Sequence, residues 1–124
     1  MVFVRSTDEL PRAERAATAA GLLIRVLDTH AETTVGSISL STMHMAKGLE
    51  FRAVVVMACD DEVIPLQERI ETATDASELE DVYNTERKLL YVACTRARDR
   101  LLLTSGGSPS EFLGDMTSRS LVRN

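Results

Sequence analysis

Arg96 is the residue whose type and position point most directly to chemistry. It belongs to the segment LLYVACTRARDR, residues 89–100, which begins as an apolar run and ends with three arginines in five positions. On a helix, Arg96 lies two turns from Leu89 and therefore on the same inward face. Arginine is rarely buried without a partner, because an unpaired buried charge is costly. Either this side chain reaches out at the helix end, or an anion such as a phosphate binds it.

The structural alternative is an amphipathic helix whose last arginines interact with the negative end of the helix dipole. Such an interaction contributes about 0.3–1 kcal/mol. It suits Arg98 and Arg100, which lie off the apolar stripe, better than it suits Arg96. A phosphate-contacting role therefore accounts for Arg96 better than the dipole does.

A second candidate site is the segment STMHMAKGLEF, residues 41–51, where an expected strand ends in hydroxyl side chains. Hydroxyls and free backbone N–H groups can hold a phosphate. Lys47 adds positive charge, and Gly48 would allow close approach of the backbone. A plain strand-to-helix turn, capped by a hydroxyl and ended by Gly48, explains the segment equally well. The candidate ligand contacts here are Thr42, His44, Lys47, Gly48 and Glu50.

The segment VVVMACDDE, residues 54–62, resembles the apolar strand with terminal acids that holds magnesium in nucleotide hydrolases. That element works with a phosphate loop of the form G-x-x-x-x-G-K-[ST], and the six glycines never take this spacing. We therefore expect the acidic residues that follow the strand to form a solvated loop. The two cysteines and two histidines also lack metal-ligand spacing, so no metal site is predicted.

The elements that would position these residues alternate between strands and helices. Apolar and β-branched runs predict strands over 2–5, 22–28, 38–43, 53–59 and 100–105. Three- and four-residue spacing predicts helices over 9–20, 77–97 and 109–116, with a loop over 60–77. We expect Thr7 or Asp8 to cap the first helix and Gly21 to end it. This order predicts an α/β fold with a mostly parallel sheet flanked by helices, in which ligands bind at the carboxyl ends of strands.

Composition limits the class of protein. The 124 residues suffice for one domain, and 44% hydrophobic with 27% charged residues is ordinary for a soluble globular protein. A net charge of −5 argues against coating nucleic acid by charge alone, although it leaves room for a local phosphate-binding surface. No apolar stretch reaches transmembrane length and no signal peptide is seen. With two isolated cysteines, we expect a cytoplasmic protein with no membrane partner.

Two stretches together resemble motifs V and VI of superfamily-one DNA helicases of the UvrD/Rep type. Motif V of that family runs roughly as [ST]-x-H-x-x-K-G-L-E-[FW], and residues 42–51 read TMHMAKGLEF. Motif VI runs roughly as E-R-[RK]-L-x-Y-V-[AG]-x-T-R-A, and residues 86–97 read ERKLLYVACTRA. The stretch FVRS, residues 3–6, is similar to the weaker motif IV. The resemblance covers residues 2–105 and implies the core of a C-terminal RecA-like motor domain, with 106–124 as an extension.

The resemblance implies ATP as cofactor and nucleotide-binding roles for three residues. Arg96 would be the catalytic arginine, reaching the γ-phosphate of ATP across a cleft. Glu50 would bind the ribose hydroxyl, and Gly48 would shape the turn beside the nucleotide. Arg5 is a further candidate for the same cleft.

The resemblance also implies single-stranded DNA as a partner. Thr42 and His44 would touch the DNA strand. Lys47 would shape the same turn and belong to the same DNA-binding surface. The three residues 86–88 would hold the motif VI helix in place.

Several parts of a complete helicase are missing from this sequence. The first motor domain, with its phosphate loop, magnesium-binding carboxylates and adenine contacts, is not found. ATP and Mg²⁺ would therefore be held mainly by an N-terminal RecA-like domain of a longer protein. The large insertion that many relatives carry between the second and third strands is replaced by a short polar stretch, residues 29–37. We expect residues 1–124 to be a single C-terminal RecA-like helicase domain without a phosphate loop, inactive as an ATPase alone.

Two other functions fit parts of the sequence. One is a free-standing module that binds nucleic acid or protein and uses no nucleotide. The other is a small nucleotide-binding enzyme in its own right. An upstream phosphate loop in the complete reading frame would favour the helicase, whereas a natural start and stop around this chain would favour the module. ATP turnover by the isolated chain would favour the enzyme.

Overall fold

The computed structural model of the chain describes residues 1–26 and 37–116. Its strands are β1 (Val2–Val4), β2 (Ile24–Val26), β3 (Ile38–Thr42), β4 (Phe51–Val56) and β5 (Ala97–Leu103). Its α-helices are α1 (Leu10–Ala19), α2 (Gln67–Thr72) and α3 (Ala76–Thr95). Short 3₁₀ helices are η1 (Thr7–Glu9), η2 (Met43–Met45) and η3 (Glu111–Met116).

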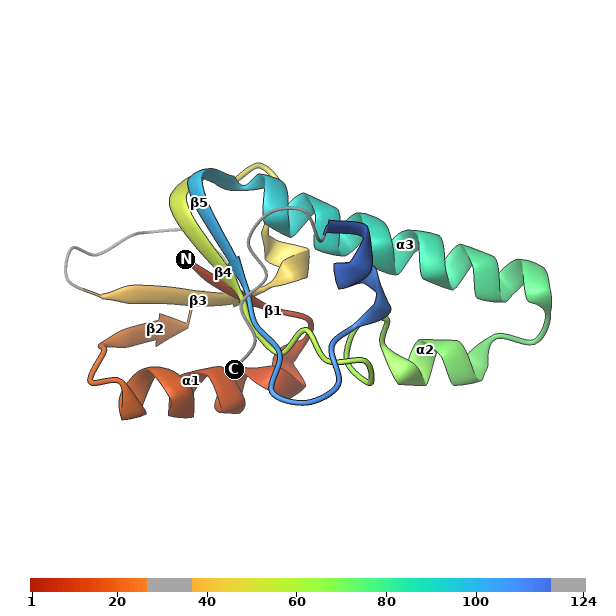
Figure 1. Ribbon diagram of the computed structural model, residues 1–124, viewed down its shortest axis with the longest axis horizontal. Coiled ribbons are helices and arrows are strands. Elements are labelled where there is room, and N and C mark those ends of the chain that lie inside the picture. The colour runs from red at the N-terminus through yellow and green to blue at the C-terminus, as the bar shows by residue number, and fades with distance from the viewer. Residues whose placement is uncertain (27–36, 117–124) are drawn as a thin grey trace.

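The five described strands form one sheet in the order β2-β3-β1-β4-β5, and every neighbouring pair is parallel. Figure 1 shows α1 along one side of this sheet, with α3 leaving it on the other. The predicted α/β fold with a parallel sheet is confirmed. Such a sheet needs cover on both faces, which explains why its central strands are so apolar.

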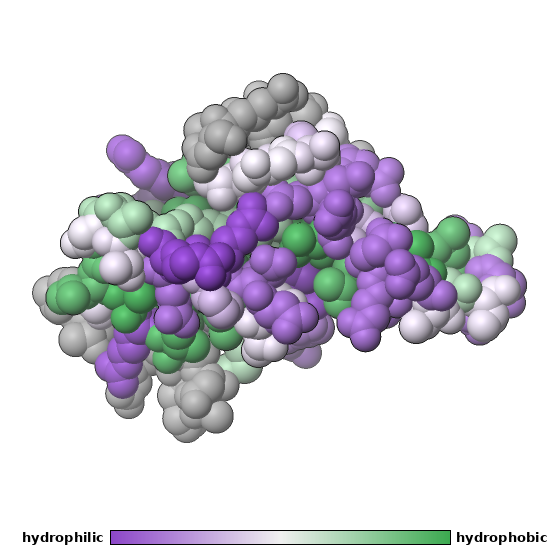
Figure 2. Space-filling model, turned by 90° about the horizontal axis from the view of Figure 1, so that it is seen from below, coloured by the Kyte–Doolittle hydropathy of each residue, from purple (hydrophilic) through white to green (hydrophobic). Residues whose placement is uncertain are grey.

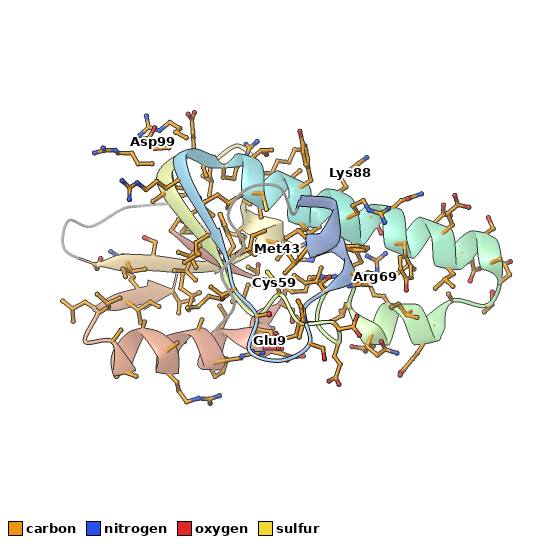
Figure 3. The ribbon with its side chains drawn as sticks, in the orientation of Figure 1. Glu9, Met43, Cys59, Arg69, Lys88 and Asp99 are labelled. Carbon is orange, nitrogen blue, oxygen red and sulfur yellow. The ribbon has the colours of Figure 1, made fainter. Side chains whose placement is uncertain are left out.

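The side chains of β1 divide the interior into two hydrophobic clusters. Phe3 packs on the α3 side with Leu90 and Val54, whereas Val2 and Val4 pack on the α1 side. Alternation of this kind is the two-residue period of a strand covered on both faces. Figure 3 shows Met43 and Cys59 between the sheet and α3, with Lys88 and Asp99 pointing outward.

The largest difference from the sequence-based expectation lies at the end of α3. This helix ends at Thr95 and not at residue 97, and β5 begins at Ala97 and not at residue 100. Arg96 is the single residue between them, and it caps the helix. Pairing of Ala97 with Phe51 starts the β4–β5 ladder and so overrides the helical periodicity of the sequence.

Other elements also differ from the sequence-based prediction. The loop expected over residues 60–77 contains α2, which is too short to show a helical period. The cap expected at Thr7 or Asp8 is wrong, because those residues form η1 and α1 begins without a side-chain cap bond. Gly21 does end the α1 region, with a φ of 76° that favours glycine. The predicted polar connection and the last residues of the chain lie outside the described residues, apart from Ser37.

The face that α1 and α2 present is mostly hydrophilic, with smaller hydrophobic areas between (Figure 2). Among the large apolar side chains that the described surface exposes, Leu22, Leu23 and Val26 lie in or beside the edge strand β2. Tyr91 is exposed on α3. None of the described helices is long and apolar enough to cross a membrane.

Candidate nucleotide and DNA interface

Glu50 and Arg96, the two expected nucleotide contacts with reactive side chains, meet at one end of the sheet. Each directly precedes the first residue of a strand, and those residues, Phe51 and Ala97, are partners in the β4–β5 register. The backbone N–H of Phe51 donates to the carbonyl of Arg96 at 2.8 Å. The amino ends of β4 and β5 therefore bring motif V and motif VI together, whereas the sequence-based expectation placed ligands at the carboxyl ends of strands.

The Arg96 side chain is partly exposed, and its hydrogen bonds to described residues all go to the end of its own helix. Its Nε donates to the carbonyl of Val92 at 3.1 Å, and its Nη2 donates to Oγ1 of Thr95 at the same distance. No carboxylate among the described residues pairs with it. The sequence placed Arg96 inside the helix on the face of Leu89, with a side chain that reaches out at the helix end or binds an anion. The helix ends at Thr95, two residues earlier than expected, and the Arg96 side chain is partly exposed at that end. The expectation of an arginine without an internal acidic partner agrees with this geometry.

Glu50 is exposed beside Arg96. Its carboxylate lies 3.7 Å from Nε of Arg98, and both side chains are more than half exposed. A pair so open to solvent is weak, so the carboxylate stays free to accept a hydrogen bond from a hydroxyl. Gly48 has a φ of 79°, and nothing lies within 4 Å of where its side chain would be. The turn thus needs glycine for its backbone angle, and the space beside Gly48 is not filled by described residues.

The expected DNA contacts lie at the opposite end of the sheet. Thr42 is the last residue of β3 and pairs in register with Val4, so it marks the carboxyl edge. In a 3₁₀ turn, residues three apart share a face. Met43 and Ala46 are accordingly buried, while His44 and Lys47 are both exposed. The turn anchors itself through two apolar side chains and presents a histidine and a lysine side by side.

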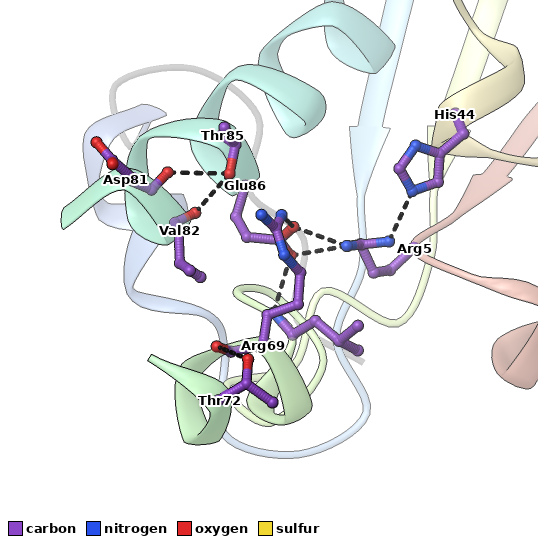
Figure 4. Close-up of polar contacts among 9 residues, drawn as sticks. Arg5, His44, Arg69, Thr72, Asp81, Val82, Thr85 and Glu86 are labelled. Carbon is purple, nitrogen blue, oxygen red and sulfur yellow. Dashed lines mark hydrogen bonds and ion pairs between the residues drawn. The ribbon is translucent and has the colours of Figure 1, made fainter. Parts of the chain in front are cut away.

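A buried carboxylate, Glu86 of α3, joins this turn to the rest of the domain (Figure 4). Arg5, directly after β1, donates to it through Nε and Nη2, both at 2.7 Å. The backbone N–H of Leu66 donates at 2.8 Å, and Nη1 of Arg69 at 2.7 Å. Arg5 is 4% exposed and Glu86 1% exposed. We call these four residues the Glu86 cluster.

His44 extends the Glu86 cluster toward the surface. Its Nε2 lies 3.1 Å from Nη1 of Arg5. Arginine can only donate, so Nε2 must be the acceptor and the proton of a neutral ring sits on Nδ1. The contact therefore leaves His44 with an N–H donor on the side away from Arg5.

The charge state of Glu86 follows from its surroundings. Burial alone would raise its pKa, but hydrogen bonds from Arg5, from the N–H of Leu66 and from Arg69 outweigh burial and lower it. The carboxylate is therefore charged at neutral pH, and two cations share it. The expected role of residues 86–88 in holding the helix fits Glu86. The Arg87 guanidinium lies 4.7 Å from the centre of the Phe112 ring.

Sequence reasoning missed the partners of two carboxylates. Arg69 lies on the unexpected helix α2, where no pattern linked it to Glu86. Asp60, expected in a solvated loop, pairs with Nη1 of Arg12 at 2.7 Å and accepts the N–H of Gly106 at 2.8 Å. Burial would raise its pKa, but these contacts lower it. Within the described residues, no three His, Cys, Asp or Glu side chains lie close enough to hold a metal ion.

The motif positions and the fold agree with one known family. A family model described as the UvrD-like helicase C-terminal domain matches residues 5–107. The chain belongs to this family. The match spans both segments of the site and includes every expected contact residue.

Relatives of this UvrD-like domain are DNA helicases. ATP-dependent DNA helicase UvrD1 of Mycobacterium tuberculosis is 38% identical over 82 residues, which are 66% of this chain and 10% of that helicase. PcrA of Staphylococcus aureus is 34% identical over 110 residues, which are 80% of this chain and 14% of that helicase. This chain thus spans about a tenth of the curated helicases it matches.

A solved structure resembles the UvrD-like domain over nearly its whole length. It is the C-terminal domain of a possible DNA helicase from Lactobacillus plantarum, with a TM-score of 0.67 and 26% identity. The match covers 99% of this chain and 65% of that one. The fold is therefore that of a helicase C-terminal domain.

Proposed function

We propose that this chain is the C-terminal motor domain of an ATP-dependent DNA helicase or translocase. In this role it supplies the arginine finger and part of the grip on single-stranded DNA. The observation that carries the proposal is the meeting of Glu50 and Arg96 at one end of the sheet. There an acceptor for a hydroxyl and a donor for a phosphate lie on neighbouring strand ends, and neither has a strong ion pair with a described residue.

Arg96 suits a phosphate whose charge grows during transfer. Its guanidinium has five N–H donors, and the described contacts occupy two of them. The three others can stabilise developing charge, which is how an arginine finger accelerates phosphoryl transfer. ATP supplies the phosphoryl group. Glu50 and Arg96 suit the ribose and the γ-phosphate of ATP. An N-terminal RecA-like domain would bind Mg²⁺ and the other phosphates.

The turn after β3 suits the backbone of a single strand. Thr42 offers a hydroxyl, His44 an outward Nδ1–H, and Lys47 a cation, all at the carboxyl edge of the sheet. Such groups contact phosphate and sugar and carry no sequence information. The Glu86 cluster connects this turn to α3, the helix that Arg96 caps. Closure of the domain on ATP would thereby move the strand grip and turn hydrolysis into translocation.

We expect the isolated chain to fold but not to hydrolyse ATP. Its buried parallel sheet needs no partner, but its sequence has no phosphate loop to hold the triphosphate. The measurement is phosphate release with single-stranded DNA present. Turnover of roughly 1 s⁻¹ or more that disappears in Asp61→Ala would contradict the proposal and identify a small enzyme instead.

We expect the isolated chain to bind single-stranded DNA weakly and without sequence preference. Few phosphate contacts are available and the net charge is −5. Affinity should fall with salt along a shallow slope, because few counterions are released. Fluorescence anisotropy across a salt series measures this.

The two lysines of the chain provide a matched comparison. Lys47→Ala should weaken DNA binding and reduce the salt slope by up to about one. Lys88→Ala removes the same charge from an outward position on α3 and should change neither. Tight binding that ignores salt, or equal effects of both variants, would rule out the proposed grip.

A further inference from the structure

Thr95, the last residue of α3, forms a closed arrangement with Arg96 and one carbonyl. Its Oγ1 donates to the carbonyl oxygen of Val92 at 2.9 Å. The same hydroxyl oxygen accepts from Nη2 of Arg96 at 3.1 Å. Nε of Arg96 donates to the same Val92 carbonyl, also at 3.1 Å. Because its proton is given to Val92, the Thr95 hydroxyl can only act as acceptor toward Arg96.

This arrangement fixes the plane of the guanidinium. The occupied groups, Nε–H and one Nη2–H, form one edge of the planar fork. Both N–H groups of Nη1 and the second of Nη2 have no partner among the described residues. A free arginine side chain has considerable rotamer entropy, which a catalytic contact must overcome at each turnover. Two bonds to the helix end hold the side chain while leaving the opposite edge for a ligand.

We propose that Thr95 is a positioning residue for the arginine finger. It does not touch the nucleotide, and it acts by orienting Arg96 so that the free edge meets the transferring phosphate. This inference rests on the proposed function of Arg96. The required feature is the hydroxyl and not the size of the side chain, so serine should replace threonine and valine should not.

The test is steady-state ATP turnover of the protein expressed from its complete reading frame, with single-stranded DNA saturating. Thr95→Val should lower kcat about tenfold, because misorientation of a reacting group costs rate and not ground-state binding. The KM for ATP should stay within about twofold. Thr95→Ala should show the same loss, and Thr95→Ser should stay within about twofold of wild type.

Thr85 provides the matched control on the same helix. Its hydroxyl also donates to carbonyls one turn back, those of Asp81 and Val82, both at 3.0 Å, and it bonds to none of the arginines that the structure describes. Thr85→Val therefore removes an equivalent helix bond, and it should leave kcat unchanged. A loss of turnover in Thr85→Val similar to that in Thr95→Val would show a general helix effect and overturn the inference.

A double-mutant cycle separates this inference from the proposed function. In an Arg96→Ala background, Thr95→Val should cause no further loss, because it acts only through Arg96. Wild-type turnover in Thr95→Val, or the same tenfold loss in both backgrounds, would refute the positioning role. Normal turnover in Arg96→Ala would instead refute the arginine finger itself. A large loss in Arg96→Ala beside an unaffected Thr95→Val would refute Thr95 alone.

Discussion

Replacement of Arg96 by alanine in the complete protein is expected to lower ATP turnover about 10³-fold, within the 10³–10⁵ range of arginine fingers. ATP binding should suffer much less, because the contact strengthens as charge develops in the transition state. The stability of the chain should change by no more than about 1 kcal/mol. The reason is that, within the described part of the chain, Arg96 bonds to Val92 and Thr95 at the helix end and pairs with no acidic residue that its loss would leave unpaired.

Two further variants make this prediction specific. Arg96→Lys should not restore turnover, since a point charge lacks the planar fork. Arg98→Ala should be far milder, because the ion pair of Arg98 with a described residue is a long, exposed one with Glu50. Thermal melts and ATPase assays on the same preparations decide the matter. If Arg96→Ala unfolds the isolated chain while the complete protein with the same change keeps normal ATP turnover, Arg96 is a structural residue.

Replacement of Glu86 by glutamine is expected to destabilise the isolated chain by about 3–5 kcal/mol, the usual cost of breaking a buried ion pair. The charge that Arg5 needs disappears, and Arg5 is almost fully buried. Since domains of this size are stable by only about 5–15 kcal/mol, this loss is large. Urea unfolding at neutral pH measures it. Glu80→Gln, an exposed acid on the same helix, should stay within about 0.5 kcal/mol of wild type.

The pH dependence of the stability difference between wild type and Glu86→Gln tests whether the charge of Glu86 causes it. The pKa of Glu86 is lower in the folded than in the unfolded chain. Its stabilisation is therefore present above the unfolded value of about 4.3 and lost as pH falls through the folded value. Wild type and Glu86→Gln should thus differ most at neutral pH and converge in acid. A difference that stays constant down to acidic pH would show that packing and not charge is involved.

A double replacement separates the ion pair from its burial. Arg5→Met combined with Glu86→Leu should cost less than Glu86→Gln alone, because apolar side chains of similar volume often replace a buried pair without loss. Arg69 is 40% exposed and can turn to water. If the double variant is as unstable as the sum of the single variants, the two side chains do not act as a pair.

The sequence by itself determined the fold class and the identity of the motif residues. Strands covered on both faces must be continuously apolar, so a strand was predicted over 53–59 without coordinates, although β4 covers Phe51–Val56. Gly21 signalled the end of α1, because few other residues adopt a positive φ. Residues 42–51 and 86–97 pointed to a helicase domain because their residue types and spacing resemble motifs V and VI of that family.

Only the tertiary structure decided where those residues lie and what holds them. Helical periodicity placed Arg96 inside a helix, but pairing of Phe51 with Ala97 ends α3 earlier and turns Arg96 into its cap. The partners of Glu86 are Arg5 after β1, Leu66 just before α2 and Arg69 within α2, at separations that no local pattern encodes. A buried charge selects partners by distance in space, and that distance exists only once the sheet and helices have packed.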